Sequence, residues 1–230
     1  MELQGARTFV AGATGALGGS LTDALLERGA RVVPGGRDAD RLAEVAGRCG
    51  TTGVMFDAVD VDSCEAATKQ AVEQLDGLDL LVVTVGAAGF GKALETSAAL
   101  TEELFAVNVL GPMSLVRAAA PHLSEGATIC VLSAVLADLP TAGMADYSAA
   151  KTALSTWLGV LRRENRRRLR VLDVRPPHLD TGLDQRALGG EPPRLPAPMP
   201  ASRVVEAVVD ALAADATEIV ADREAGLLAR

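Results

Sequence analysis

Tyr147 and Lys151 stand four residues apart near the start of a helix-forming run, in the segment Tyr-Ser-Ala-Ala-Lys. Positions i and i+4 lie one helical turn apart on the same face, so we expect these two side chains to be neighbours. An ammonium group close to a phenol favours the phenolate, and the spacing predicts that Lys151 lowers the pKa of Tyr147 from its ordinary value of about 10. Such a tyrosine can exchange a proton with an alcohol or carbonyl oxygen near neutral pH. The pair alone is a weak signal, because unrelated residues of an amphipathic helix show the same spacing.

A glycine-rich turn, Gly12-Ala-Thr-Gly-Ala-Leu-Gly18, lies near the other end of the chain, between a strand-like run and a helix-like run. Small residues allow the backbone to approach a pyrophosphate, and the helix N-terminus offers it unpaired N–H donors and positive potential. Strand, glycine turn and helix in this order predict a dinucleotide site rather than a plain tight turn.

The elements that must hold these residues alternate along the chain. The run 78–85 is continuously apolar, which is typical of a central strand in a parallel sheet. Repeated strand–helix units predict an α/β fold, a doubly wound parallel sheet with helices on both faces, spanning residues 1–230 as a single domain. Strands are expected at 8–11, 30–34, 53–56, 78–85, 128–133 and 169–174, and helices at 15–28, 38–48, 62–75, 100–120 and 146–167.

The regular alternation stops at Pro176, and seven of the eleven prolines lie between there and Pro200. A long run without its own strand pattern is typical of a lid or of a linker. The 30 residues after it carry a helix pattern at 201–214 and a short strand pattern at 218–221, which is too little for another domain. Segment 177–200 is therefore predicted to be a substrate lid.

Composition limits the classes of partner. Hydrophobic residues make up 49% of the 230 residues, and the formal net charge of −8 argues against nucleic acid or an anionic membrane as the main partner. We identify neither a signal peptide nor an apolar stretch of 18 residues, and expect no membrane span and a cytoplasmic protein. Three widely spaced cysteines, Cys49, Cys64 and Cys130, fit neither a disulfide framework nor a metal site, and are expected to be reduced and mostly buried.

Taken in order, these motifs resemble the short-chain dehydrogenase/reductase family over nearly the whole chain. The glycine turn fits that family's TGxxGxxG variant, with Ala11 where threonine is usual. Asp57 opens a D-x-x-D motif after the third strand, and in the family this aspartate holds the adenine amino group. Segment 83–86 reads Val-Thr-Val-Gly where the family has Asn-Asn-Ala-Gly, so only Gly86 is kept. The implied fold is Rossmann-like.

The catalytic residues that the resemblance implies are Asn108, a serine, Tyr147 and Lys151. Tyr147 would be the general acid or base, Lys151 would bind the nicotinamide ribose, and Asn108 would help to hold a water that relays protons. The segment Arg175-Pro-Pro-His-Leu-Asp-Thr181 lies where the family has Pro-Gly-x-x-x-Thr, which meets the nicotinamide. The cofactor contacts expected from these motifs are Gly12, Thr14, Gly15, Ala16, Leu17, Gly18, Arg37, Asp57, Ala58, Val85, Gly86, Asn108, Tyr147, Lys151, Pro176, Leu179 and Thr181.

The family's catalytic serine usually precedes the tyrosine by thirteen residues, and that position here is Ala134. Its neighbour Ser133 would point to the opposite face of a regular strand, unless a bulge or turn at the strand end brings it round. Three alternatives remain open. Ser133 replaces the family serine after a local shift; the enzyme works without it, using another donor or the substrate's own groups; or redox activity is reduced or lost.

The end of the second strand predicts the cofactor. NAD sites place a carboxylate there to accept from the ribose 2′-hydroxyl, whereas this chain has Gly36 followed by Arg37. A guanidinium suits a 2′-phosphate, so NADPH is favoured over NADH. Asp38 is interpreted as the cap of the next helix, although it could compete for the ribose. His178 is either structural or a substrate-binding or proton-donating residue.

The sequence therefore predicts an NADPH-dependent oxidoreductase that interconverts a carbonyl and an alcohol on a small organic substrate. The alternative is a non-redox cofactor-binding sensor or interaction module, or a cyclase-type enzyme on the same fold. The resemblance further implies a homodimer or homotetramer, because in the family the helix that here carries Trp157 packs against its mate in a second subunit.

Overall fold

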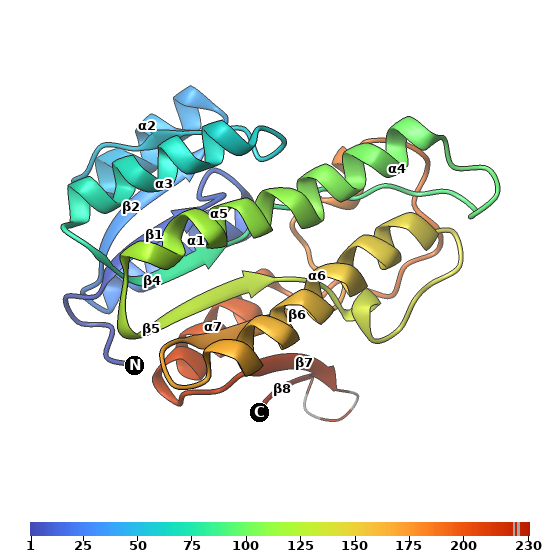
Figure 1. The fold of residues 1–230 in the computed structure, drawn as a ribbon. Coiled ribbons are helices and arrows are strands. Elements are labelled where there is room, and N and C mark those ends of the chain that lie inside the picture. Colours follow the sequence, from blue (N-terminus) through green and yellow to red (C-terminus); the bar gives the residue numbers. More distant parts are fainter. Residues whose placement is uncertain (223, 225) are drawn as a thin grey trace.

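The computed structural model describes residues 1–222, 224 and 226–230. Their centre is an eight-stranded sheet in the order β3-β2-β1-β4-β5-β6-β7-β8 (Figure 1). Strands β1 to β7 are parallel, and β8 pairs antiparallel with β7 at one edge. The strands are β1 Arg7–Ala11, β2 Arg31–Gly36, β3 Val54–Met55, β4 Leu78–Val83, β5 Leu123–Leu132, β6 Arg170–Arg175, β7 Glu218–Asp222 and β8 Gly226–Ala229.

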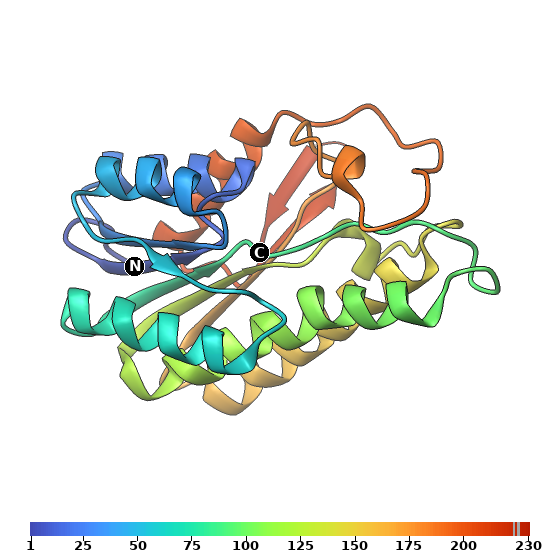
Figure 2. The same ribbon diagram turned by 90° about the horizontal axis from the view of Figure 1, so that it is seen from above.

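Helices cover both faces of this sheet, which confirms the doubly wound α/β prediction (Figure 2). One apolar core joins the sheet to α3, α5 and α6, and a second joins it to α1, α2 and α7. The helices are α1 Ala16–Glu27, α2 Ala39–Cys49, α3 Val61–Leu75, α4 Ala98–Phe105, α5 Gly111–Ala119, α6 Ala145–Asn165 and α7 Ala201–Ala213, with short turns η1 Ala106–Leu110, η2 Ala120–His122, η3 Val135–Ala137 and η4 Asp184–Arg186.

Local chemistry explains where several of these elements begin. The Asp38 side chain accepts from the Arg41 backbone N–H and caps α2, as the sequence predicted. Asp60 caps α3 in the same way. Successive side chains of β1 point to opposite faces, so Phe9 lies in the first core and Val10 in the second. A parallel sheet covered on both faces needs apolar residues at both kinds of position.

Two regions differ from the sequence prediction. The strand β8 was not predicted, because its four residues carry no alternation and are defined by pairing with β7. The single helix expected at 100–120 is divided by the π-helical turn η1, where the chain holds one extra residue per turn. Such turns are frequent at functional sites, and this one contains Asn108.

The run Ala98–His122 has the length and composition of a membrane span. An 18-residue window within it has a mean hydropathy of 1.3. The prediction that no apolar stretch reaches 18 residues overlooked this run. Its hydropathy is high because Arg117 is the one charged residue between Leu104 and Pro121. In the fold, half of that window is buried against the rest of the protein, as expected for a core helix. Cys64 and Cys130 are buried, Cys49 is half-buried, and all three thiols are free.

Candidate active site

The carboxyl ends of the parallel strands meet at one edge of the sheet, and the predicted motifs follow these ends. Gly12 follows β1, Arg37 follows β2, Gly86 lies just beyond β4, and Pro176 follows β6. Open α/β sheets bind ligands in the crevice outside this edge. The fold therefore brings together residues that are far apart in the sequence.

Tyr147 and Lys151 lie on the first two turns of α6, facing the end of β5. Both residues are buried, Tyr147 with 7% and Lys151 with 3% of its surface exposed. The Lys151 Nζ lies 5.9 Å from the centroid of the Tyr147 ring. Nζ donates a hydrogen bond of 3.3 Å to the Leu132 carbonyl. A methyl group on Gly86 would lie 3.2 Å from this Nζ and 3.2 Å from Asn108 Oδ1, so glycine allows the loop after β4 to approach both side chains.

Asn108 is fully buried and joins the loop after β4 to α4. Its Oδ1 accepts from the Ala87 N–H at 3.1 Å, and its Nδ2 donates to the carbonyls of Ala87 and Leu104, both at 2.9 Å. These bonds satisfy a buried amide that would otherwise be costly. Asn108 thus fixes the loop against which Lys151 lies.

Burial dominates the electrostatics of the pair. It raises the pKa of Tyr147 to about 12 and lowers the pKa of Lys151 to about 8, the latter opposed by attraction to Asp173. The prediction that Lys151 lowers the pKa of Tyr147 is therefore wrong for this structure, since removal of the phenol from water outweighs the neighbouring ammonium. Tyr147 is protonated at neutral pH, which is the form that can donate a proton.

Ser133 does not point toward Tyr147. Its hydroxyl donates to Asp173 Oδ1 at 2.5 Å, on the α6 side of the sheet. Ala134 has extended backbone angles, φ −169° and ψ 160°, so strand alternation continues and its methyl group joins the apolar cluster that contains Tyr147. The alternative in which Ser133 replaces the family serine after a local shift does not agree with this geometry.

The glycine turn fits a dinucleotide through its lack of side chains. Gly12 has φ +99°, and a methyl group there would lie 2.5 Å from Thr84 Oγ1. A methyl group on Gly18 would lie 2.2 Å from the Gly12 carbonyl oxygen, a distance that no side chain tolerates. Gly15 caps α1 without a side-chain hydrogen bond, so the first N–H groups of the helix are left for an anion.

The end of β2 has no place for a carboxylate. Gly36 is buried, and a methyl group there would lie 2.5 Å from the Thr14 methyl group. Arg37 is exposed and forms no hydrogen bond or ion pair with the residues that the structure describes. The Asp38 carboxylate is used at the start of α2 and lies 3.6 Å from the guanidinium of Arg41.

Asp57 and Ala58 follow β3, where the adenine is expected. Asp57 is exposed, and its Oδ1 accepts from the Val59 N–H at 3.1 Å. The Ala58 carbonyl packs so closely on α5 that a methyl group on Gly111 would lie 2.5 Å from its oxygen. This contact places the two predicted adenine residues beside the helix that follows Asn108.

The lid segment after Pro176 is attached to the loop after β4. The Leu188 N–H donates to the Ala88 carbonyl at 2.8 Å, and the Phe90 N–H donates to the Gly189 carbonyl at 3.0 Å. Apolar residues of the lid pack on the cluster that contains Tyr147. That cluster consists of Ala88, Phe90, Leu104, Ala134, Leu136, Met144 and Tyr147, with Leu100, Leu183, Ala187, Leu188 and Leu195 packed against it.

The remaining predicted contacts lie in or beside this lid. Leu179 forms a bridge to Met199, and the Thr181 carbonyl accepts from Arg186 at 3.0 Å. His178 Nδ1 lies 2.9 Å from the Pro196 carbonyl oxygen, and its Nε2 lies 3.9 Å from Asp184 Oδ1. These contacts favour the structural interpretation of His178, because its ring joins two parts of the lid.

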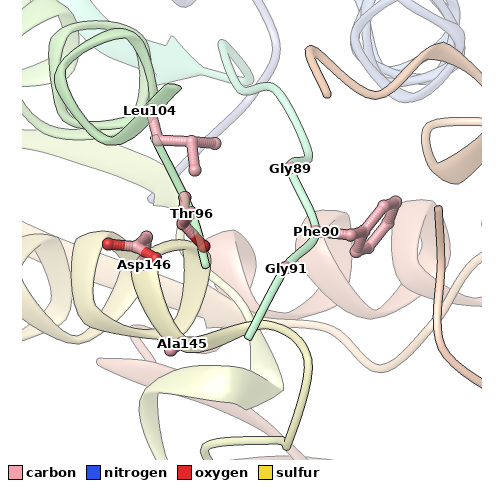
Figure 3. Close-up of a pocket in the computed structure, with 7 residues that line it drawn as sticks. All are labelled: Gly89, Phe90, Gly91, Thr96, Leu104, Ala145 and Asp146. Atoms are coloured by element: carbon pink, nitrogen blue, oxygen red, sulfur yellow. The ribbon is translucent and has the colours of Figure 1, made fainter. Parts of the chain in front are cut away.

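A small notch lies at the start of α6, just before Tyr147 in the chain. Figure 3 shows segment 89–91 facing Leu104 and Thr96, with Asp146 at the start of α6. The notch has no room for even one water molecule, so it cannot hold a substrate. The Thr101 hydroxyl donates to Asp146 at 3.1 Å and joins α6 to α4. The notch therefore marks where α4 and α6 meet and is not a substrate pocket.

Sequence reasoning missed the apolar wall and a buried charge pair. Leu136 lies in the short turn η3 and Met144 directly before α6, and no motif distinguishes them from other core residues. Asp173 and Arg175 could have been found, since they alternate in the buried second half of a strand whose other charged residue, Arg170, stands at its first position.

Comparison with known proteins agrees with this geometry. The family described as short chain dehydrogenase matches residues 7–191. A protein from Escherichia coli (strain K12), named cyclic-di-GMP-binding biofilm dispersal mediator protein, is 33% identical over 183 residues, which cover 77% of this chain and 74% of that protein. A short chain dehydrogenase from Burkholderia cenocepacia J2315, solved in complex with NADP, has 30% identity and a TM-score of 0.82, covering 95% of this chain and 88% of that one. A family structure from Burkholderia phymatum, in complex with NAD, has 21% identity and a TM-score of 0.85 over 96% and 90% of the two chains, a likeness in fold alone.

Proposed function

The chain belongs to the short-chain dehydrogenase/reductase family and is an NAD(P)-dependent oxidoreductase, and from this premise we propose that it transfers hydride between NADPH and a small, largely apolar carbonyl or alcohol substrate. The observation that carries the proposal is the placement of Tyr147. A buried, protonated phenol beside Lys151 faces an apolar cluster, at the sheet edge where the glycine turn lies.

The chain's own groups supply the proton and the orientation. When bound, the nicotinamide cofactor supplies or accepts the hydride. Tyr147 gives its proton to the carbonyl oxygen in reduction and accepts one from the alcohol in oxidation. Lys151 lies close enough to stabilise the phenolate that remains after this transfer, and its bond to the Leu132 carbonyl directs the ammonium. Asn108 holds the backbone against which Lys151 lies.

Ala134 changes how the substrate oxygen is stabilised. Its methyl group lies where the family has a hydroxyl, and Ser133 is bonded to Asp173. Removal of one donor from an oxyanion site typically costs roughly 10²–10³-fold in rate. We therefore expect a slow enzyme on simple ketones, and a faster one on substrates that carry an activating group or a hydrogen-bond donor of their own.

The preference for NADPH rests on the end of β2. A side chain at position 36 would collide with Thr14, so the usual carboxylate does not fit there, and Arg37 is exposed beside it without a partner in the described part of the chain. A charge-assisted bond from a guanidinium to a 2′-phosphate favours the phosphorylated cofactor.

A panel of activated ketones and quinones tests this function. We expect NADPH oxidation with at least one member, lost in Tyr147→Phe. Thr128→Ala is the matched control, because its hydroxyl is buried on β5 without a hydrogen-bond partner in the described residues and lies outside the site. Binding of NADPH with no turnover on any substrate would contradict an oxidoreductase of this kind.

A second candidate is a non-redox binding protein. It is favoured by the alanine at position 134 and by the Escherichia coli relative whose name describes cyclic-di-GMP binding. In this case the sheet edge would hold a phosphorylated nucleotide without hydride transfer. Titration with cyclic-di-GMP and with NADPH separates the two, since competition without turnover supports the binding protein and turnover supports the enzyme.

A further inference from the structure

A buried carboxylate, Asp173, lies on β6 beside the helix that carries Tyr147 and Lys151. Asp173 is 1% exposed. Its Oδ1 accepts from the Ser133 hydroxyl at 2.5 Å, and its Oδ2 accepts from the Ser155 hydroxyl at 2.6 Å. Arg175 Nε lies 3.3 Å from Oδ2. A buried charge is costly unless it is paired and hydrogen-bonded, so three polar partners around one carboxylate form a built arrangement.

Both serine partners of Asp173 are placed next to Lys151. Ser155 is four residues after Lys151, so the two share a face of α6 one turn apart. Ser133 directly follows Leu132, whose carbonyl accepts from Lys151 Nζ. The carboxylate therefore connects the strand end and the helix turn between which the lysine lies.

Resting on the proposed function, we propose that Asp173 is a positioning residue for Lys151, whose ammonium it keeps charged and whose supporting strand and helix it joins through Ser133 and Ser155. The active-site lysine thus works with a buried carboxylate that lies between β5 and α6. The role belongs to the charge of Asp173 as well as to its hydrogen bonds.

The groups that face Lys151 agree with this role. Tyr147 on α6 is neutral, η1 contributes the neutral Asn108, and β5 contributes a carbonyl oxygen. Burial lowers the pKa of Lys151 to about 8, and the attraction of Asp173 opposes this change. Arg175, beyond Asp173, is neutralised by Asp138 at 2.7 Å and Glu218 at 2.8 Å, and Glu218 also binds Arg162 and Arg230.

The chain offers a direct measurement, because it has only three lysines. Lys69 and Lys92 are exposed, so in protein labelled with ¹³C at lysine Cε the buried Lys151 can be resolved and titrated by NMR. Asp173→Asn keeps the shape and removes the charge, and both serine contacts are kept when one hydroxyl changes from donor to acceptor opposite the amide NH2 group. We expect the pKa of Lys151 to fall by about one unit, with Lys69 and Lys92 unchanged.

Asp138→Asn is the matched control, because it removes a carboxylate from the same arginine without touching Asp173. Here the Lys151 titration should stay as in the parent. If Asp173→Asn folds poorly, the double variant Asp173→Asn/Arg175→Gln removes the unpaired guanidinium as well, and the downward shift should remain. An unchanged Lys151 titration in both variants, or an equal shift in Asp138→Asn, would overturn the proposal.

Turnover gives the second readout. The alkaline limb of the pH–rate profile should move to lower pH by the same amount as the Lys151 titration in Asp173→Asn, and stay in place in Asp138→Asn. A shifted NMR titration in a protein that reduces no carbonyl would support the role of Asp173 and reject the proposed function. A rate loss without movement of the limb or of the titration would show a merely structural residue.

Discussion

The two halves of the sheet edge are built by opposite means. The turn after β1 works through side chains that are missing, since Gly12 and Gly18 let backbone atoms approach to distances that a methyl group would forbid. The other half, at the end of β6 and the facing turns of α6, works through side chains that are charged and buried, which are Asp173 and Arg175 on β6 and Lys151 on α6. The first half can position an anion with fixed backbone dipoles, whereas the second half carries charges whose state depends on their neighbours. Binding and chemistry should therefore respond differently to substitution.

The sharpest test of this separation is Tyr147→Phe. Loss of a general acid typically costs roughly 10²–10⁴-fold, so turnover should fall by that factor. NADPH affinity should be nearly unchanged, because the glycine turn and the Arg37 region are intact. Steady-state kinetics and calorimetric titration measure the two quantities. Full turnover in this variant would show that the proton comes from another group.

The sequence predicted the binding half more completely than the catalytic half, for a physical reason. A strand, a glycine turn and a helix are local features, and their order sufficed for the fold and for the Gly12–Gly18 loop. Simple alternation indicated that Ser133 points away from Tyr147, as the structure shows, whereas the candidate role of Ser133 as the catalytic serine does not agree with its bond to Asp173. The pKa of Tyr147 was predicted in the wrong direction because burial is a property of the folded chain. The ties between Asp173 and its serine partners are equally non-local.

The catalytic half should contain a group that costs stability. Lys151 has a pKa of about 8 in the fold against 10.5 ordinarily, so its charged form is disfavoured when buried. Below pH 8 both states hold the proton, and the buried charge lowers the free energy of unfolding by about 3 kcal/mol. Between pH 8 and 10.5 the folded protein has released the proton that the unfolded chain still holds, so this loss of stability shrinks as the pH rises. Lys151→Met should therefore raise the free energy of unfolding at pH 7, while turnover is lost.

Urea unfolding at several pH values checks this prediction. The gain of Lys151→Met over the parent should shrink as the pH rises from 8 to 10.5. Lys69→Met is the control, since its side chain is exposed and the same substitution should give no such pH dependence. A gain that is constant across the range would mean that the lysine is not destabilised by burial.

The binding half should fail through sterics instead. Gly18→Ala places a methyl group 2.2 Å from the Gly12 carbonyl oxygen, so the loop must move away from its position. Overpacking of this kind costs roughly 1–3 kcal/mol, and we expect a loss of cofactor affinity together with a lower melting temperature. Gly47→Ala is the matched control, because nothing lies near its added methyl group and α2 should be stabilised by roughly 0.5–1 kcal/mol. Equal behaviour of the two variants would argue against close approach as the basis of the site.

Arg37→Ala should have the smallest effect and the most specific one. The parent is expected to bind NADPH at least about tenfold more tightly than NADH, which is about 1.4 kcal/mol. Arg37 is exposed, so its contact with a 2′-phosphate is screened by water and salt, and the preference should weaken at high ionic strength. The substitution should remove most of the preference while NADH affinity stays the same, because NADH has no phosphate at that position. Arg41→Ala is the control: its guanidinium already pairs with Asp38 on α2. Equal affinities for the two cofactors in the parent would contradict the proposed preference for NADPH. Gly36 would then mean that the site accepts NADPH and NADH alike.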